Sequence, residues 1–186
     1  LSTPLLIVGS VFLLIANFPL PQWDTWMSHL LGKDWATMMS VPASASFDVM
    51  TILAVVGIAY SLGKQFNVDA MQAGIIALVS FFIVTPYQTL FTPENSSKVY
   101  EVTSLPLKWM GSSGLFLGMI VALIATRLFV AIVRKGWTIK MPEGVPPTVV
   151  KSFEALIPSF LVVTLMFLVN WLAALTPYGN LQDVIF

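Results

Sequence analysis

Few side chains in this sequence could carry acid, base or nucleophilic chemistry. His29 is the only histidine, and the 186 residues contain no cysteine. Because a zinc site needs several nitrogen or sulfur ligands, the sequence argues against a structural or catalytic zinc, and we expect no metal and no cofactor. His29 could accept a phosphoryl group in principle, but we prefer to interpret it as a solvent-side or interfacial histidine.

The glycine and serine residues form no catalytic motif. The sequence contains neither the Gly-x-x-x-x-Gly-Lys-Ser/Thr phosphate loop nor the Gly-x-Ser-x-Gly nucleophile elbow. Gly114 and Gly118 lie four residues apart, a spacing that puts them on one helix face and lets two helices approach closely. We therefore predict helix packing, with a partner in this chain or in a second copy, and no catalytic residue.

Three ionisable side chains interrupt or border otherwise apolar runs: Asp48, Arg127 and Glu154. Each falls within a turn or two of an expected helix end. Arg127 can extend its head toward a membrane surface, and Asp48 and Glu154 suit the positive N-terminal ends of their helices. A proton relay or ion pathway needs deep, paired charges, and this sequence places none at mid-membrane.

The composition identifies the environment of these residues. Hydrophobic residues make up 57% and charged residues 10%, the net charge is zero, and the mean hydropathy is +0.87. Soluble domains carry about 25% charged residues. The composition excludes a disordered chain and a disulfide scaffold, and it leaves no basic excess for nucleic acid. It predicts an integral membrane protein.

The charge-free stretches predict the membrane helices. A spanning helix needs about 20 mostly apolar residues. Four stretches meet or approach that length, and a shorter one does so if Asp48 is tolerated near its start. We predict an all-α integral membrane protein with about five transmembrane helices, at residues 1–18, 44–62, 70–90, 109–133 and 153–175. Pro86 is expected near the end of the third helix and Pro158 inside the fifth.

The distribution of lysine and arginine predicts the orientation, because cytoplasmic loops carry the excess of these residues. One side has six of them, namely Lys64, Arg127, Arg134, Lys135, Lys140 and Lys151, and the other has Lys33, Lys98 and Lys108. The N-terminus is therefore predicted to be cytoplasmic. His29 falls on the outer side, in a tryptophan-rich segment at residues 19–42. That segment is interpreted as an interfacial hairpin or short helix in preference to a sugar-stacking platform.

Several segments together resemble a known family. The most specific begins Gly144-Val145-Pro146-Pro147 and continues through Ser152-Phe153 to Pro158, and Pro142 precedes it. Weaker similarity lies in the first two helices and in residues 105–111. The chain resembles enzyme IIC, the membrane component of the lactose/cellobiose (diacetylchitobiose) family of bacterial phosphotransferase systems.

The resemblance implies a function for the longer protein. Family members import a β-linked disaccharide of the cellobiose, diacetylchitobiose or lactose type across the bacterial inner (cytoplasmic) membrane. The partner enzyme IIB phosphorylates the sugar with phosphate that comes through HPr and enzyme IIA. Members are homodimers with roughly twice as many membrane helices as are expected here.

The chain begins with Leu1 and not with Met, so we expect a fragment of a longer protein. The resemblance implies that residues 1–186 are the N-terminal half of such a transporter, which acts as its dimerisation scaffold. The resemblance assigns the essential His and Glu near the sugar to the C-terminal half. His29 and Glu154 do not lie in those motifs, so no substrate-binding residue is assigned, and the chain alone is not expected to transport or phosphorylate sugar. The alternative is a self-contained small membrane channel or a structural partner subunit.

Overall fold

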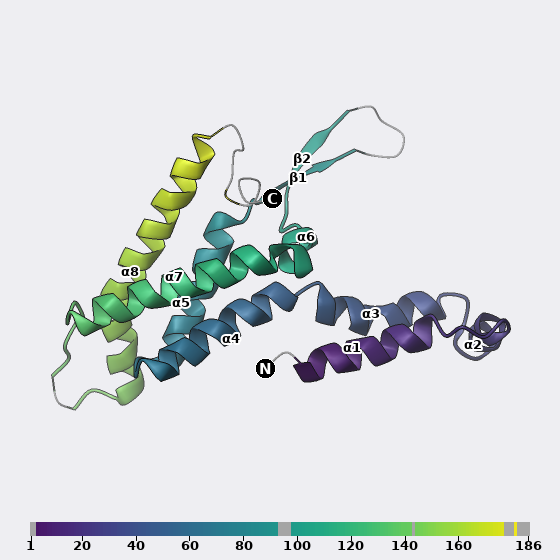
Figure 1. Cartoon of the computed structure of the whole chain (residues 1–186), viewed down its shortest axis with the longest axis horizontal. Helices are drawn as coiled ribbons and strands as arrows, with labels where there is room; N and C mark the ends of the chain where they lie inside the picture. Colours follow the sequence, from purple (N-terminus) through teal and green to yellow (C-terminus); the bar gives the residue numbers. More distant parts are fainter. Residues whose placement is uncertain (1–2, 93–97, 143, 177–180, 182–186) are drawn as a thin grey trace.

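A computed structural model of the chain describes residues 3–92, 98–142, 144–176 and 181, and these residues are mostly helical (Figure 1). The predicted helical membrane fold is confirmed, although the order of elements is richer than expected. The elements are α1 (Thr3–Ala16), α2 (Trp23–Leu31), α3 (Trp35–Phe47), α4 (Met50–Gln65), α5 (Ala70–Val84), β1 (Gln88–Phe91), β2 (Tyr100–Thr103), α6 (Leu107–Met110), the 3-10 turn η1 (Ser112–Gly114), α7 (Leu115–Arg134) and α8 (Pro147–Ala174).

Three helical stretches are long and apolar enough to cross a bilayer, by length and composition. They are Trp35–Gln65, Ser112–Arg134 and Pro147–Ala174. The remaining two of the five predicted spans correspond to the shorter apolar helices α1 and α5. Every predicted span therefore coincides with a helix, but α1 and α5 have only 14 and 15 residues.

Helices α4, α5, α7 and α8 pack together around the apolar core (Figure 1). All four helices contribute to the largest fully buried side chains there, which include Val55, Phe81, Leu117, Val121, Phe129 and Val162. Among the described residues four polar side chains are buried, and two of them, Ser80 and Thr85, donate to carbonyls one turn earlier. The hydroxyl of Ser80, for example, donates to the carbonyl of Ile76 one turn earlier.

Helices α1 and α3 form an antiparallel pair that continues away from this bundle along the line of α4, with α2 at its far end (Figure 1). The predicted second helix began at residue 44, but α3 begins at Trp35 and a short break separates it from α4. Asp48 lies in that break as the C-cap of α3, not within the first turn of a continuous helix. Close approach of α1 requires Gly9, because a Cβ there would lie 2.9 Å from the Cβ of Ser46.

The third predicted helix was too long. Helix α5 ends at Val84, and Thr85 is extended with a ψ of 134°. The physical reason is Pro86, whose ring disfavours the helical conformation of the residue before it. The next residues, predicted as helix to Leu90, form instead an antiparallel hairpin in which Gln88 pairs with Thr103 and Phe91 with Tyr100. The all-α prediction did not include this hairpin.

Helix α8 begins six residues earlier than predicted. Pro147 is its first residue, a position where the missing N–H costs nothing and the fixed φ is already helical. Glu154 was predicted to lie in the first turn of this helix. It lies instead about two turns inside α8. Pro158 lies inside α8, as expected, and is buried.

Candidate functional site

The residues singled out for chemistry do not converge in the fold. His29 is exposed in the last turn of α2, far from α7 and α8 (Figure 1). Asp48 lies at the α3–α4 break, and Arg127 and Glu154 occupy α7 and α8. Within the described ranges, no group of three or more histidine and acidic side chains is placed to hold a metal ion.

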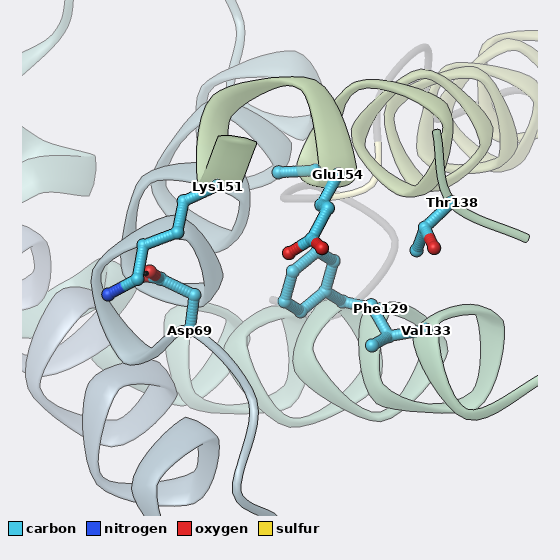
Figure 2. Close-up of a pocket in the computed structure, with 7 residues that line it drawn as sticks. Asp69, Phe129, Val133, Thr138, Lys151 and Glu154 are labelled. Atoms are coloured by element: carbon cyan, nitrogen blue, oxygen red, sulfur yellow. Dashed lines mark ion pairs between the residues drawn. The ribbon is translucent and has the colours of Figure 1, made fainter. Parts of the chain in front are cut away.

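A small polar cavity lies where α5, α7 and α8 meet (Figure 2). Its volume is about 170 Å³, and its lining combines Asp69, Lys151, Glu154 and Thr138 with the apolar Phe129, Val133 and Ala155. Sites for small organic ligands are usually about 300–1,000 Å³. The cavity is therefore smaller than a site that encloses a disaccharide.

Asp69 organises one wall of this cavity. Its carboxylate caps α5 by accepting hydrogen bonds from the backbone N–H groups of Met71 and Gln72, at 3.1 and 3.0 Å. The Nζ of Lys151 on α8 lies 3.6 Å from its second oxygen. One carboxylate thus satisfies the start of α5 and also contacts α8, so the cavity wall joins two helices.

Glu154 belongs to the opposite wall. Figure 2 shows its carboxylate directed toward Phe129 on α7, whereas Lys151 reaches toward Asp69. The two carboxylates therefore do not share one proton or one cation in this arrangement. The site serves best as a polar junction between helices, and nothing in its geometry resembles a nucleophile with its general base.

Two of the larger surface pockets are lined in part by α8. One of about 650 Å³ runs along α8 beside α5 and is lined mainly by apolar side chains, together with Gln72, Ser152 and Ser159. The hydroxyls of Ser152 and Ser159 already donate to carbonyls one turn earlier in α8. This pocket is therefore mostly an exposed apolar helix face.

The other pocket, of about 380 Å³, lies at the base of the β1–β2 hairpin. Neutral polar side chains dominate its lining, including Tyr87, Gln88, Thr103 and Asn170. The side-chain oxygen of Asn170 is buried and has no hydrogen-bond partner among the residues that the structure describes. Sequence reasoning missed this pocket because the hairpin brings together residues that are more than 80 positions apart in the chain.

The tryptophan-rich segment forms α2 and the start of α3, so the predicted short helix is present. Trp35 is 2% exposed and donates its indole N–H to the carboxylate of Asp24 at 2.9 Å. Trp23 donates to the carbonyl of Ile15 at 2.8 Å. Trp35 is thus buried and Trp23 half-buried, each with its indole N–H hydrogen-bonded, whereas Trp26, at 67% exposure, presents an open ring.

The proline-containing motif builds the entry to α8. Gly144 adopts a φ of +101°, Pro146 is the N-cap and Pro147 is the first helical residue. Pro142 and Phe153 are exposed, and the hydroxyl of Ser152 donates to the carbonyl of Thr148. These positions therefore set the course of the backbone and do not gather at a pocket as a group.

The two packing glycines occupy different settings. Gly118 lies in α7 against α4, and a Cβ there would come within 2.6 Å of the Thr51 side chain. Gly114 precedes α7 in the η1 turn, where a Cβ would overlap the backbone carbonyl of Trp109. Both contacts lie within this chain, and the two glycines contact different elements, Gly114 the backbone of α6 and Gly118 the side chains of α4.

Comparison with known proteins identifies the family to which this chain is similar. The family described as "Phosphotransferase system, EIIC" matches residues 1–186. The chain is 39% identical to the PTS system cellobiose-specific EIIC component of Geobacillus stearothermophilus and 40% identical to the lichenan permease IIC component of Bacillus subtilis (strain 168), each over 186 residues. All of this chain is covered, but only 41% of each relative, so the chain spans about two fifths of their length.

A solved structure gives the same result in three dimensions. The crystal structure of the transporter ChbC, the IIC component from the N,N'-diacetylchitobiose-specific phosphotransferase system, superposes with a TM-score of 0.94 at 41% identity. The match covers 100% of this chain and 43% of that one. The apolar helices and this relationship place the chain in the bacterial inner membrane. Since the family match extends over the entire sequence, the chain belongs to the EIIC family of the phosphotransferase system.

Proposed function

We propose that the chain forms the N-terminal scaffold and dimerisation half of a transporter that imports a β-linked disaccharide. The observation that carries this proposal is the superposition of the whole chain on 43% of the N,N'-diacetylchitobiose IIC component, with a TM-score of 0.94. A relative of comparable identity is named as cellobiose-specific and another as a lichenan permease. Sugars of that class are therefore the proposed cargo.

Coupling to phosphorylation is part of the same proposal. Transport by phosphotransferase systems delivers the sugar to an enzyme IIB partner, which receives its phosphate through IIA and HPr. In that process this chain is proposed to act as a scaffold and not as the catalyst. The ionisable side chains of its described residues do not assemble into a catalytic group. The sugar site is accordingly proposed to lie in the part of the longer transporter that this chain does not match.

A rigid body suits a scaffold. Helices α4, α5, α7 and α8 pack around fully buried side chains, and close contact at Gly118 leaves little room between α7 and α4. Exposed apolar side chains remain along α1 and α8, where lipid, a second copy or further protein can cover them. A homodimer would bury part of that surface.

The test is equilibrium dialysis of labelled cellobiose and diacetylchitobiose against the purified chain in detergent, with the mass measured by light scattering on the same sample. The complete N,N'-diacetylchitobiose IIC component is the positive control. A dimer without saturable sugar binding is expected. A monomer would contradict the dimerisation role. Saturable binding would contradict the proposal that the sugar site lies outside this chain. In the latter case N170A would test the pocket at the hairpin base first.

A further inference from the structure

Two arginines of α7 lie over one aromatic ring of the α4–α5 turn. The guanidinium carbon of Arg127 lies 5.1 Å from the centre of the Phe66 ring, and that of Arg134 lies 5.2 Å from it. Arg134 also donates to the backbone carbonyl of Phe66 at 3.5 Å. Because both approach the same ring, the two guanidinium carbons are at most about 10 Å apart.

The positive charge of this pair is not neutralised by the described part of the chain. Neither guanidinium has a carboxylate partner among those residues, where Asp69 instead pairs with Lys151. Both arginine side chains are exposed. An aromatic face attracts a cation without cancelling its charge, so the pair retains the capacity to bind an anion.

The position of Arg127 indicates which anion. Leu123 and Ile124 lie one turn before it on α7 and are 45% and 46% exposed, so an open apolar surface leads directly to the guanidinium. Arg134 lies seven residues further, about 10 Å along the helix axis, at the end of α7. A charged group beside a lipid-facing surface requires a partner, and the headgroup phosphate lies where hydrocarbon gives way to water.

We propose that Arg127, Arg134 and Phe66 form a binding site for the headgroup of an anionic phospholipid. The two guanidinium groups bind the phosphate, and the acyl chains lie against Leu123 and Ile124. Nearby, the Nζ of Lys135 lies 5.4 Å from the ring of Trp137, which is 54% exposed. Tryptophan favours the headgroup level of a membrane, so this contact fits the same depth.

The test is native mass spectrometry of the chain in a neutral detergent, titrated with phosphatidylglycerol or with phosphatidylcholine. Phosphatidylglycerol is expected to bind more tightly. The double variant R127Q/R134Q is expected to lose about tenfold or more of that affinity, because two charge-assisted contacts disappear. The control K140Q removes one charge from the α7–α8 connection and is expected to bind as the unaltered chain does.

Two further experiments distinguish a lipid from other anions, and a loss of binding from a loss of folding. Inorganic phosphate should not displace phosphatidylglycerol, since it lacks acyl chains; displacement at millimolar concentration would overturn the assignment to a lipid. Equal affinity for the two lipids, or unchanged affinity of R127Q/R134Q, would overturn the site itself. If the double variant is unfolded by circular dichroism, the single variant R134Q and the charge-preserving F66L decide, and both must weaken phosphatidylglycerol binding.

Discussion

Lys151 on α8 and Asp69 at the start of α5 form an ion pair whose two partners have unequal structural roles. The Nζ–Oδ2 distance is 3.6 Å, and the lysine side chain is 63% exposed, against 24% for the aspartate. Asp69 also caps α5 through two backbone N–H groups, whereas Lys151 contributes the ion pair alone. The contact is therefore more sensitive to loss of the acid than to loss of the base.

Substitution of the two partners should show this asymmetry. D69A should lower the free energy of unfolding by about 1–2 kcal/mol, because the helix cap is lost together with the pair. K151Q should cost less than about 1 kcal/mol, since an exposed ion pair contributes little. Thermal unfolding in detergent, followed by circular dichroism, measures both. Equal losses would show that the cap does not stabilise α5.

Gly118 and Gly74 provide a matched pair for the helix contacts. G118A should destabilise the chain by about 1–3 kcal/mol, because the new methyl group would lie 2.6 Å from the Thr51 side chain. At Gly74 the nearest atom would be 3.4 Å away, on Val56, which is an ordinary contact. G74A should therefore be neutral or stabilising by up to about 1 kcal/mol through helix propensity. The same unfolding measurement applies, and a stable G118A would contradict the close approach of α7 to α4.

The tryptophans of the α2–α3 segment should respond differently to the same change. W35F should cost about 1–3 kcal/mol, because a buried ring shrinks and the indole hydrogen bond to Asp24 is lost. W26F changes an exposed ring and should leave stability within about 0.5 kcal/mol of the original value. Acrylamide quenching adds a direct check, since quenching should fall in W26F and not in W35F.

The start of α8 predicts an effect on transport, on the basis of the proposed function. Replacing Pro146 and Pro147 with glycine removes the fixed φ values at the N-cap and first helical residue, and should cost about 0.4–1 kcal/mol or more. Uptake of labelled cellobiose by the complete transporter should decrease. P142G, which lies outside the helix, is the control. Normal uptake at normal expression would show that the stiff entry to α8 is dispensable.

Much of this fold could be predicted from apolar runs and charges. The charge-free stretches coincide with α1, α4, α5, α7 and α8, because nothing but lipid or apolar core accommodates such segments. The residues at which these helices begin and end were less predictable. Pro86 ends α5 earlier than hydropathy suggests, and Pro147 starts α8 earlier, since backbone conformation at proline overrides hydrophobicity at both ends.

The sites depended on tertiary contacts that no local spacing reveals. Phe66 and Arg127 are 61 positions apart, and nothing in either segment indicates that they meet. The hairpin was missed for a related reason, since its eight exposed residues carry no buried face and hence no alternation of apolar side chains. The proline motif was recognised from sequence, but its role in positioning α8 emerged only from the backbone.

The unequal lengths of α5 and α8 have a consequence for the surrounding bilayer. With 28 residues α8 is about 42 Å long, whereas the 15 residues of α5 extend over about 22 Å. A hydrocarbon layer is about 30 Å thick. The first two turns of α8 carry the exposed Lys151 and Glu154, so its apolar part, Ala155 to Ala174, is about 30 Å long and matches that thickness, whereas its packed neighbour α5 falls short of it. Hydrophobic mismatch, relieved by local thinning of the bilayer beside α5, is therefore built into this pair, and lipid chain length becomes a determinant of its geometry.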